Sequence, residues 1–244
     1  MTSPAEAAMR VRSLSVVIPV HNEEGILGET VKRITSGLGQ LGLEAWEVIL
    51  CENGSTDRTR EVAEELARTQ PGVRTLVSAA PDYGAAMRAG FQAAAGDAVV
   101  NFDADYYDLD FVRRALAADA HIVVAGKGVP GAEDTRRLSR RLVSRGFSWL
   151  VRRVLRVRVA ETHGMKVFRR EAIAPILPLV RATKDLFDTE LLVRAERAGL
   201  RIAILPVRTV ELRRSRTAIL SRVPRTLWGL LRIRARLRRE GRFR

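Results

Sequence analysis

The sequence LSVVIPVHNEE at residues 14–24 is an apolar run that ends in a polar loop containing two carboxylates. The β-branched residues between Leu14 and Val20 predict a buried strand. The apolar residues that follow recur at the spacing of a helix: Leu27, Val31, Ile34 and Leu38. This segment therefore predicts one strand and one helix, the first unit of an α/β domain.

The same alternation of strand and helix continues along the chain. Further strands are predicted at residues 46–51, 73–77, 98–102, 121–125, 166–168 and 202–207. Further helices are predicted at residues 57–67, 85–95, 136–157 and 186–198, and from residue 222 onward. Repeated units of this length predict an α/β fold with a mostly parallel, doubly wound sheet and right-handed crossovers. Ligands of such sheets bind where the carboxyl ends of strands meet loops and helix N-termini.

Three acidic loops occupy that position, at residues 19–24, 52–57 and 103–108. The chain as a whole is basic, with 42 Lys and Arg against 28 Asp and Glu and a net charge of +14. An acidic cluster within a basic chain favours a metal site over a solvated surface. Asp103 and Asp105 are the predicted ligands of Mg²⁺ or Mn²⁺, because these hard cations bind carboxylate oxygens. An Asp-x-Asp pair often arises by chance, and its position directly after a strand makes this one informative.

Four motifs occur in a fixed order along the first half of the chain: Val16–Glu24, Glu52–Asp57, Tyr83–Ala86 and Phe102–Asp105. With these motifs, residues 14–210 resemble the inverting glycosyltransferases of family 2, which have the GT-A fold. The resemblance implies that the donor nucleotide sugar is bound by Pro19, Val20, Asn22, Glu23, Glu52, Asn53, Ser55, Asp57, Gly84, Asp103, Ala104 and Asp105. In the family, the Asp-x-Asp pair holds the metal and the diphosphate. Glu52-Asn53 replaces the usual Asp-Asp, so the resemblance does not indicate which base is bound.

The second half resembles a narrower branch, the enzymes that glycosylate polyprenyl or dolichyl phosphate. The resemblance is carried by Gly126–Gly131, Arg136 and Arg140, Glu161–Phe168, and Phe187–Leu192. It implies that Lys127, Arg136 and Arg140 meet the donor diphosphate or an acceptor phosphate, where cations bind strongly. It also implies that His163 lines the acceptor pocket. Glu161 stands where the branch usually has Asp, which leaves room for an altered acceptor pocket.

Asp188 is the predicted general base, because transfer to a hydroxyl needs a carboxylate near the attacking oxygen. An acceptor that is already a phosphate needs little deprotonation, and Asp188 would then orient or bind it. The structural alternative is that Asp188 caps the following helix, and Glu190 is the second choice for the base. Structural alternatives also exist for the donor loops. Asn22 and Glu23 could begin the first helix, and Ser55 and Asp57 could cap the second.

The location of the protein in the cell is predicted from several features of the sequence. Residues 1–13 form a predicted flexible N-terminus without a signal peptide, and no apolar run reaches the ~18–20 residues that span a bilayer. The single Cys51 excludes an intramolecular disulfide framework and favours a cytosolic compartment. Residues 211–244 form a predicted basic amphipathic tail. This tail and residues 136–157 could pack on the core or lie on an anionic membrane surface, and a peripheral position at the inner membrane face is favoured.

The predicted function is therefore the metal-dependent transfer of a sugar, with inversion, from a nucleotide diphosphate to a polyprenyl-phosphate-type lipid. A small soluble hydroxyl compound is the alternative acceptor. The rival from another class is a nucleic-acid-binding protein on a degenerate GT-A fold, which the positive charge favours. A content of only 5% aromatic residues and the lack of a nucleic-acid module argue against it. The sequence does not indicate the donor sugar or the oligomeric state.

Overall fold

A seven-stranded mixed sheet forms the centre of the computed structural model, which describes residues 11–135, 138–159, 161–162, 164–209 and 219–241. Its strands are β1 (Ser13–Val20), β2 (Ala45–Asn53), β3 (Val73–Ser78), β4 (Ala98–Asn101), β5 (Ile122–Gly126), β7 (Lys166–Arg169) and β8 (Ile202–Pro206). They are arranged in the order β3-β2-β1-β4-β7-β5-β8. Strand β7 runs antiparallel to both of its neighbours, and all other neighbouring pairs are parallel. The predicted α/β fold with a mostly parallel sheet is confirmed.

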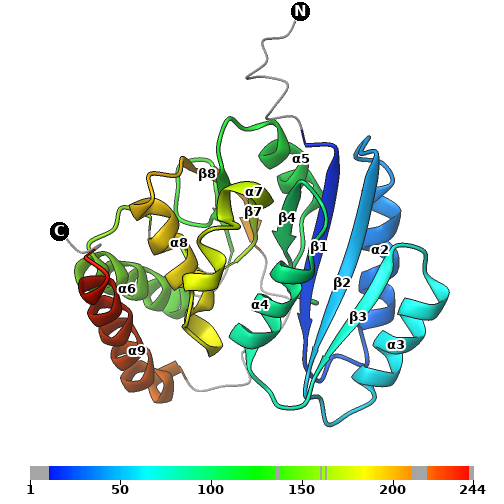
Figure 1. Ribbon diagram of the computed structural model, residues 1–244, viewed down its shortest axis with the longest axis horizontal. Coiled ribbons are helices and arrows are strands. Elements are labelled where there is room, and N and C mark those ends of the chain that lie inside the picture. The colour runs from blue at the N-terminus through cyan, green and yellow to red at the C-terminus, as the bar shows by residue number, and fades with distance from the viewer. Residues whose placement is uncertain (1–10, 136–137, 160, 163, 210–218, 242–244) are drawn as a thin grey trace, which may run out of the picture.

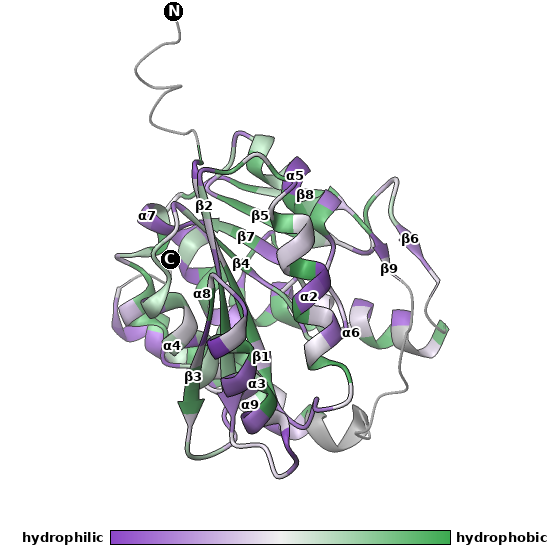
Figure 2. Ribbon diagram, turned by 90° about the vertical axis from the view of Figure 1, so that its right-hand side faces the viewer, coloured by the Kyte–Doolittle hydropathy of each residue, from purple (hydrophilic) through white to green (hydrophobic). Residues whose placement is uncertain are grey.

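Helices cover both faces of the sheet (Figures 1 and 2). One face packs against α2 (Leu27–Leu38), α3 (Thr59–Thr69) and α5 (Leu109–Ala117). The other packs against α4 (Tyr83–Ala93), α7 (Arg170–Ile173) and α8 (Phe187–Arg197). Because side chains alternate along a strand, Val16 of β1 enters the first core and Val17 enters the second. Both cores are apolar, so the sheet is a rigid platform for the loops at its edge.

The second half of the chain adds smaller elements and two outer helices. The smaller elements are β6 (Glu133–Asp134), β9 (Arg208–Thr209) and the 3₁₀-helices η1 (Leu177–Leu179) and η2 (Lys184–Leu186). Helices α6 (Leu138–Leu155) and α9 (Ile219–Arg239) lie side by side (Figure 1) and share a third core with α8. Within the described ranges, no helix combines the length and apolar character needed to cross a membrane.

Some local elements differ from the prediction. Helix α5 was not predicted, although Asp108 marks its start by accepting a hydrogen bond from the Phe111 N–H at 2.9 Å. Helix α3 begins at Thr59, and its N-cap residue is Arg58, whose side chain makes no capping bond. Asp57, one residue earlier, accepts a hydrogen bond from the Thr59 N–H at 2.9 Å. The predicted capping role of Ser55 is wrong, because its hydroxyl is bonded to the neighbouring loop instead.

Candidate active site

The carboxyl ends of β1, β2 and β4 lie together because these strands are adjacent and parallel. The loops after them surround a pocket on that edge of the sheet. The pocket is lined by Pro19, Val20, His21, Glu23, Asn53, Tyr83, Asp103, Ala104 and Asp105. The structure therefore brings seven of the twelve residues that the first four motifs imply for the donor to one place, together with His21 and Tyr83, for which no donor contact was predicted.

The first two loops are locked to one another by Asn22. This residue has a left-handed backbone with φ 57°, and its Oδ1 accepts a hydrogen bond from the Thr56 N–H at 2.8 Å. Its own N–H donates to Ser55 Oγ at 3.1 Å. The alternative in which Asn22 and Glu23 begin the first helix is wrong, because α2 begins only at Leu27. Asn22 instead fixes the shape of the pocket wall.

Glu52 and Asn53 have different positions at the end of β2. Glu52 is almost fully buried, and its Oε1 accepts from the Ser55 N–H at 2.6 Å, so its carboxylate shapes the loop. Asn53 lines the pocket, and its Oδ1 accepts from the Asp82 N–H at 2.7 Å. Gly54 directly follows Asn53 and has φ 64°. A Cβ at this position would meet Pro81 N at 2.9 Å. The close approach of two backbones at this turn requires glycine.

Asp103 and Asp105 form the acidic centre of the pocket. The backbone of Asp103 pairs with Tyr106 through two hydrogen bonds of 3.1 Å, and this tight turn presents both carboxylates to the pocket. Burial, followed by the neighbouring charges of Asp105 and Asp188, raises the pKa of Asp103 to about 6. Lys166 and Lys127 act in the opposite direction and lower it. Such crowding of carboxylates is relieved when a divalent cation binds between them, so the residues fit a Mg²⁺ or Mn²⁺ site.

The protein alone supplies few ligands for such a cation. Among the described residues, no group of three or more His, Cys, Asp or Glu side chains is placed to hold a metal ion. Mg²⁺ is commonly bound by one or two carboxylates together with substrate phosphates and water. Asp103 and Asp105 match this type of shared site.

Asp188 lies beside the acidic centre, within the first turn of α8. The Tyr83 hydroxyl donates to its Oδ2 at 2.9 Å, and Lys166 Nζ lies 3.4 Å from its Oδ1. Oδ1 is buried, and apart from this ion pair with Lys166 it accepts no hydrogen bond from the described part of the chain. The helix-cap alternative is wrong, because the N-cap of α8 is Leu186 and no side chain caps it. A buried carboxylate with one unsatisfied oxygen is available to a ligand.

Lys166 is the clearest residue that sequence reasoning missed. Its side chain is fully buried in β7, and Nζ donates to the Gly164 carbonyl at 2.6 Å. Asn101 fixes this segment beside Asp103: its Oδ1 accepts from the Lys166 N–H at 2.9 Å. A lysine in an apolar strand is itself a signal, because buried lysines are almost always paired.

Of the remaining predicted residues, the structure describes Lys127, Gly84 and Glu190, and none of these three lines the pocket. Lys127 follows β5, with Nζ 5.2 Å from the centroid of the Tyr106 ring, and its charge acts on Asp103. Gly84 is buried under the segment before α8, where a Cβ would meet Thr183 Cα at 2.7 Å. Arg136 and His163 lie outside the described residues, as does the side chain of Arg140. Glu190 is fully buried in an ion-pair cluster away from the pocket lining.

Two curated relatives share sequence with most of this chain. Glycosyltransferase AglD of Haloferax volcanii is 33% identical over 252 residues, which cover 97% of this chain and 40% of that protein. The undecaprenyl-phosphate 4-deoxy-4-formamido-L-arabinose transferase of Pectobacterium carotovorum is 33% identical over 173 residues, 68% of this chain and 52% of that protein. The chain thus spans only 40% and 52% of the lengths of these two relatives.

Solved structures share the fold. Mannosyl-3-phosphoglycerate synthase from Rubrobacter xylanophilus has a TM-score of 0.66 at 20% identity, covering 95% of this chain and 76% of that one. Glucosyl-3-phosphoglycerate synthase from Mycobacterium tuberculosis, in complex with Mn²⁺, UDP and glucosyl-3-phosphoglycerate, has a TM-score of 0.64 at 23% identity, covering 96% and 84%. These similarities confirm the predicted GT-A fold. The profile described as Glycosyl transferase family 2 matches residues 15–177, and the chain therefore belongs to this family of glycosyltransferases.

Proposed function

We propose that this glycosyltransferase moves a sugar, with inversion, from a nucleotide diphosphate to a polyprenyl-phosphate-type lipid at the inner face of the cell membrane. Binding of a nucleotide-sugar donor is supported mainly by the pocket in which Asp103 and Asp105 lie beside Asn53 and Tyr83. A polyprenyl-phosphate acceptor is supported by the name of one relative, an undecaprenyl-phosphate transferase. A nucleotide donor and Mn²⁺ are supported by a neighbour of the same fold that holds both UDP and Mn²⁺.

The proposed reaction forms a bond between the acceptor oxygen and the anomeric carbon of the sugar. The bond from that carbon to the diphosphate oxygen breaks, and its electron pair leaves with the nucleotide diphosphate. A Mg²⁺ or Mn²⁺ ion held by Asp103 and Asp105 would offset the charge that develops there. Lys127 adds positive charge on the same side, since it also acts on Asp103. Asp188, held by Tyr83 and Lys166, would orient a phosphate acceptor or accept a proton from a hydroxyl acceptor.

The donor half can be tested by thermal unfolding with UDP, GDP or dTDP and their common sugars, with and without Mn²⁺. A ligand at a hundred times its dissociation constant should stabilise the chain by about 2.7 kcal/mol. For a chain of this size that corresponds to a shift of about 5–10 °C.

The metal-dependent part of that shift should grow as the pH rises from 5 to 7. The pKa of Asp103 is raised to about 6, so at pH 5 a proton competes with the cation for this carboxylate, and above the pKa it does not. A matched series without metal controls for pH effects on the fold. If no nucleotide shifts the unfolding temperature at either pH, the donor site is contradicted.

The membrane half of the proposal rests on α6 and α9. Every charged residue within these two helices is an arginine. Helix α9 has two apolar stripes: Leu230, Ile233 and Leu237 are fully buried in the third core, whereas Val223, Leu227, Trp228 and Leu231 are exposed. Packing of α9 on the protein core explains the buried stripe. It does not explain the exposed stripe, which an ordinary surface helix would not need.

Helix α6 has the same division. Val151 and Leu155 are fully buried, whereas the exposed apolar side chains are Leu138, Leu142, Val143 and Trp149. Leu138, Leu142 and Trp149 are spaced by four and seven residues, which places them on one side of the helix. Apolar side chains among arginines match an anionic membrane surface, where the apolar groups enter the headgroup region and the cations meet lipid phosphates.

Replacing Trp149 and Trp228 by serine should weaken binding to vesicles that contain phosphatidylglycerol. These side chains are 64% and 57% exposed, so both present apolar surface to a membrane, although the Arg232 guanidinium lies 3.5 Å from the centroid of the Trp228 ring. Losing both should raise the lipid concentration for half-binding by roughly 10-fold or more. A sedimentation assay measures this, with Val77→Ser, another exposed apolar residue, as the control. Equal binding by the double variant and the control would contradict a role of this surface in membrane binding.

A further inference from the structure

The segment 181–186 lies directly before Asp188 and is enclosed by two helices. On the side of α4, a Cβ added to Gly84 would meet Thr183 Cα at 2.7 Å. On the side of α9, a Cβ added to Gly229 would meet Leu186 Cδ1 at 2.2 Å. Because neither glycine has a side chain, α4 and α9 can each approach this segment closely. The backbone at Thr183 therefore has little room to move toward α4, and on the other side the Leu186 side chain packs directly on α9.

Hydrogen bonds hold the backbone of the same segment. Glu190 Oε2 accepts from the N–H groups of Arg181 and Ala182 at 3.0 and 2.5 Å. Asp82 Oδ1 accepts from the Lys184 N–H at 3.0 Å. Lys184 itself has a left-handed backbone with φ 52°, a conformation that costs free energy for a residue other than glycine. The surrounding contacts must therefore hold this turn in place.

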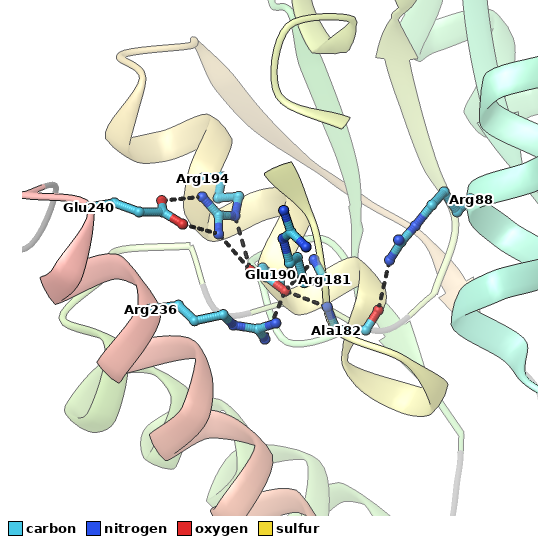
Figure 3. A network of polar contacts seen from close by, with 7 residues as sticks. All are labelled: Arg88, Arg181, Ala182, Glu190, Arg194, Arg236 and Glu240. Carbon is cyan, nitrogen blue, oxygen red and sulfur yellow. Dashed lines mark hydrogen bonds and ion pairs between the residues drawn. The ribbon is translucent and has the colours of Figure 1, made fainter. Parts of the chain in front are cut away.

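Glu190 also connects the segment to α9. This carboxylate is fully buried, and it bonds Arg194 of its own helix at 2.8 Å and Arg236 of α9 at 3.2 Å. Glu240, just after α9, bonds Arg194 at 2.7 Å. Figure 3 shows Glu190 between the guanidinium groups of Arg194 and Arg236. A single buried carboxylate thus joins α8, α9 and the segment before Asp188.

We infer that α9 is a positioning element of the active site, with Gly229 and Glu190 as its positioning residues. Through close contact at Leu186 and the charge cluster at Glu190, α9 fixes the segment 181–186, and the segment places Asp188 against Tyr83. The inference rests on the proposed role of Asp188. The same helix, α9, carries the exposed apolar stripe that is proposed to bind the membrane. Membrane contact and the placement of Asp188 would then depend on one helix. The donor pocket is built by the loops after β1, β2 and β4, so α9 should affect transfer more than donor binding.

Gly229→Ala tests this, with Gly146→Ala as the matched control. Both glycines lie within long helices, but a Cβ at Gly146 meets nothing within 4 Å. The change in helix propensity is therefore the same, and only Gly229→Ala disturbs the contact with Leu186. We expect Gly229→Ala to lower kcat for transfer about 10-fold or more, because small misplacements of a reacting group are costly. The KM for the donor should stay within about 2-fold, and Gly146→Ala should match the wild type.

Amide hydrogen exchange provides a readout that does not depend on activity. The amides of Arg181, Ala182 and Lys184 should lose protection in Gly229→Ala and keep it in Gly146→Ala. Glu190→Gln, a second variant, should also lose protection at Arg181 and Ala182 because their acceptor loses its charge.

Three results would overturn the inference. These are equal transfer by the two alanine variants, loss of transfer with unchanged protection, or a rise in donor KM that accompanies the loss of kcat. The last would indicate general loosening of the fold. A wild-type chain that transfers nothing would instead contradict the proposed function, and the exchange comparison would still decide whether α9 orders this segment.

Discussion

Asp105→Ala should abolish sugar transfer, with kcat/KM at least about 1000-fold below the wild type. Asp103 and Asp105 are the two carboxylates proposed to bind the cation, so the loss of one removes half of its proposed protein ligands. Charge stabilisation by a bound metal ion contributes several kcal/mol to such reactions, and each 1.4 kcal/mol corresponds to a tenfold change in rate. Initial-rate measurements over a range of Mn²⁺ concentrations would detect the loss.

The same variant should lose the Mn²⁺-dependent part of the nucleotide-induced thermal shift. The metal-independent part should remain, because the Asn22–Thr56 contact between the first two loops is untouched. Asp110→Ala is the matched control: it removes an exposed carboxylate of α5 that pairs with Arg113 and Arg114. Exposed pairs of this kind contribute little to stability. Transfer by Asp105→Ala within 10-fold of the control would rule out the metal site.

The sheet could be predicted from the sequence because each strand contains a short apolar run. All seven predicted strands occur, and strands such as β4 and β5 that are buried on both faces are almost entirely apolar. The antiparallel placement of β7 between β4 and β5 was not predicted. It depends on pairing between residues far apart in sequence, such as Asn101 with Lys166. Periodicity along one segment carries no information about its neighbour in the sheet.

The candidate site was predictable where residues follow a strand directly. Asp103, Asp105 and Asn53 lie where the strand-end rule places them. The supporting residues were not predictable in this way. Tyr83 and Lys166 reach Asp188 from elements more than 20 residues away along the chain, and only the folded structure brings them together.

The outer helices show another limit of sequence patterns. The chain from residue 222 onward was predicted as one basic amphipathic helix, but the structure separates the apolar residues of this helix into a buried stripe and an exposed stripe. A helix with apolar residues at i, i+3, i+4 and i+7 on two overlapping faces gives one broad signal in the sequence. Only the packing against α6 and α8 shows which residues remain available to a membrane.

Asp188→Asn should lower kcat for transfer by about 100-fold to 10,000-fold while leaving donor binding unchanged. The amide keeps the size of the side chain and can still accept from the Tyr83 hydroxyl, but it cannot take a proton and leaves Lys166 Nζ without its anionic partner. Tyr83→Phe is the comparison variant, because it removes one hydrogen bond to Asp188 and keeps the carboxylate. It should cost far less, about 10-fold.

The pH dependence of the Asp188→Asn defect separates the two roles proposed for this residue. If Asp188 accepts a proton from a hydroxyl acceptor, part of the pH dependence of wild-type kcat comes from this residue, and the variant loses that part. If the acceptor is already an anionic phosphate, no proton is removed, and the defect stays constant across the pH range. Near-wild-type transfer by Asp188→Asn would contradict both roles. The buried Oδ1, which forms an ion pair with Lys166 but accepts no hydrogen bond, would then need another explanation, because a buried carboxylate oxygen without a hydrogen bond is costly unless a ligand completes its contacts.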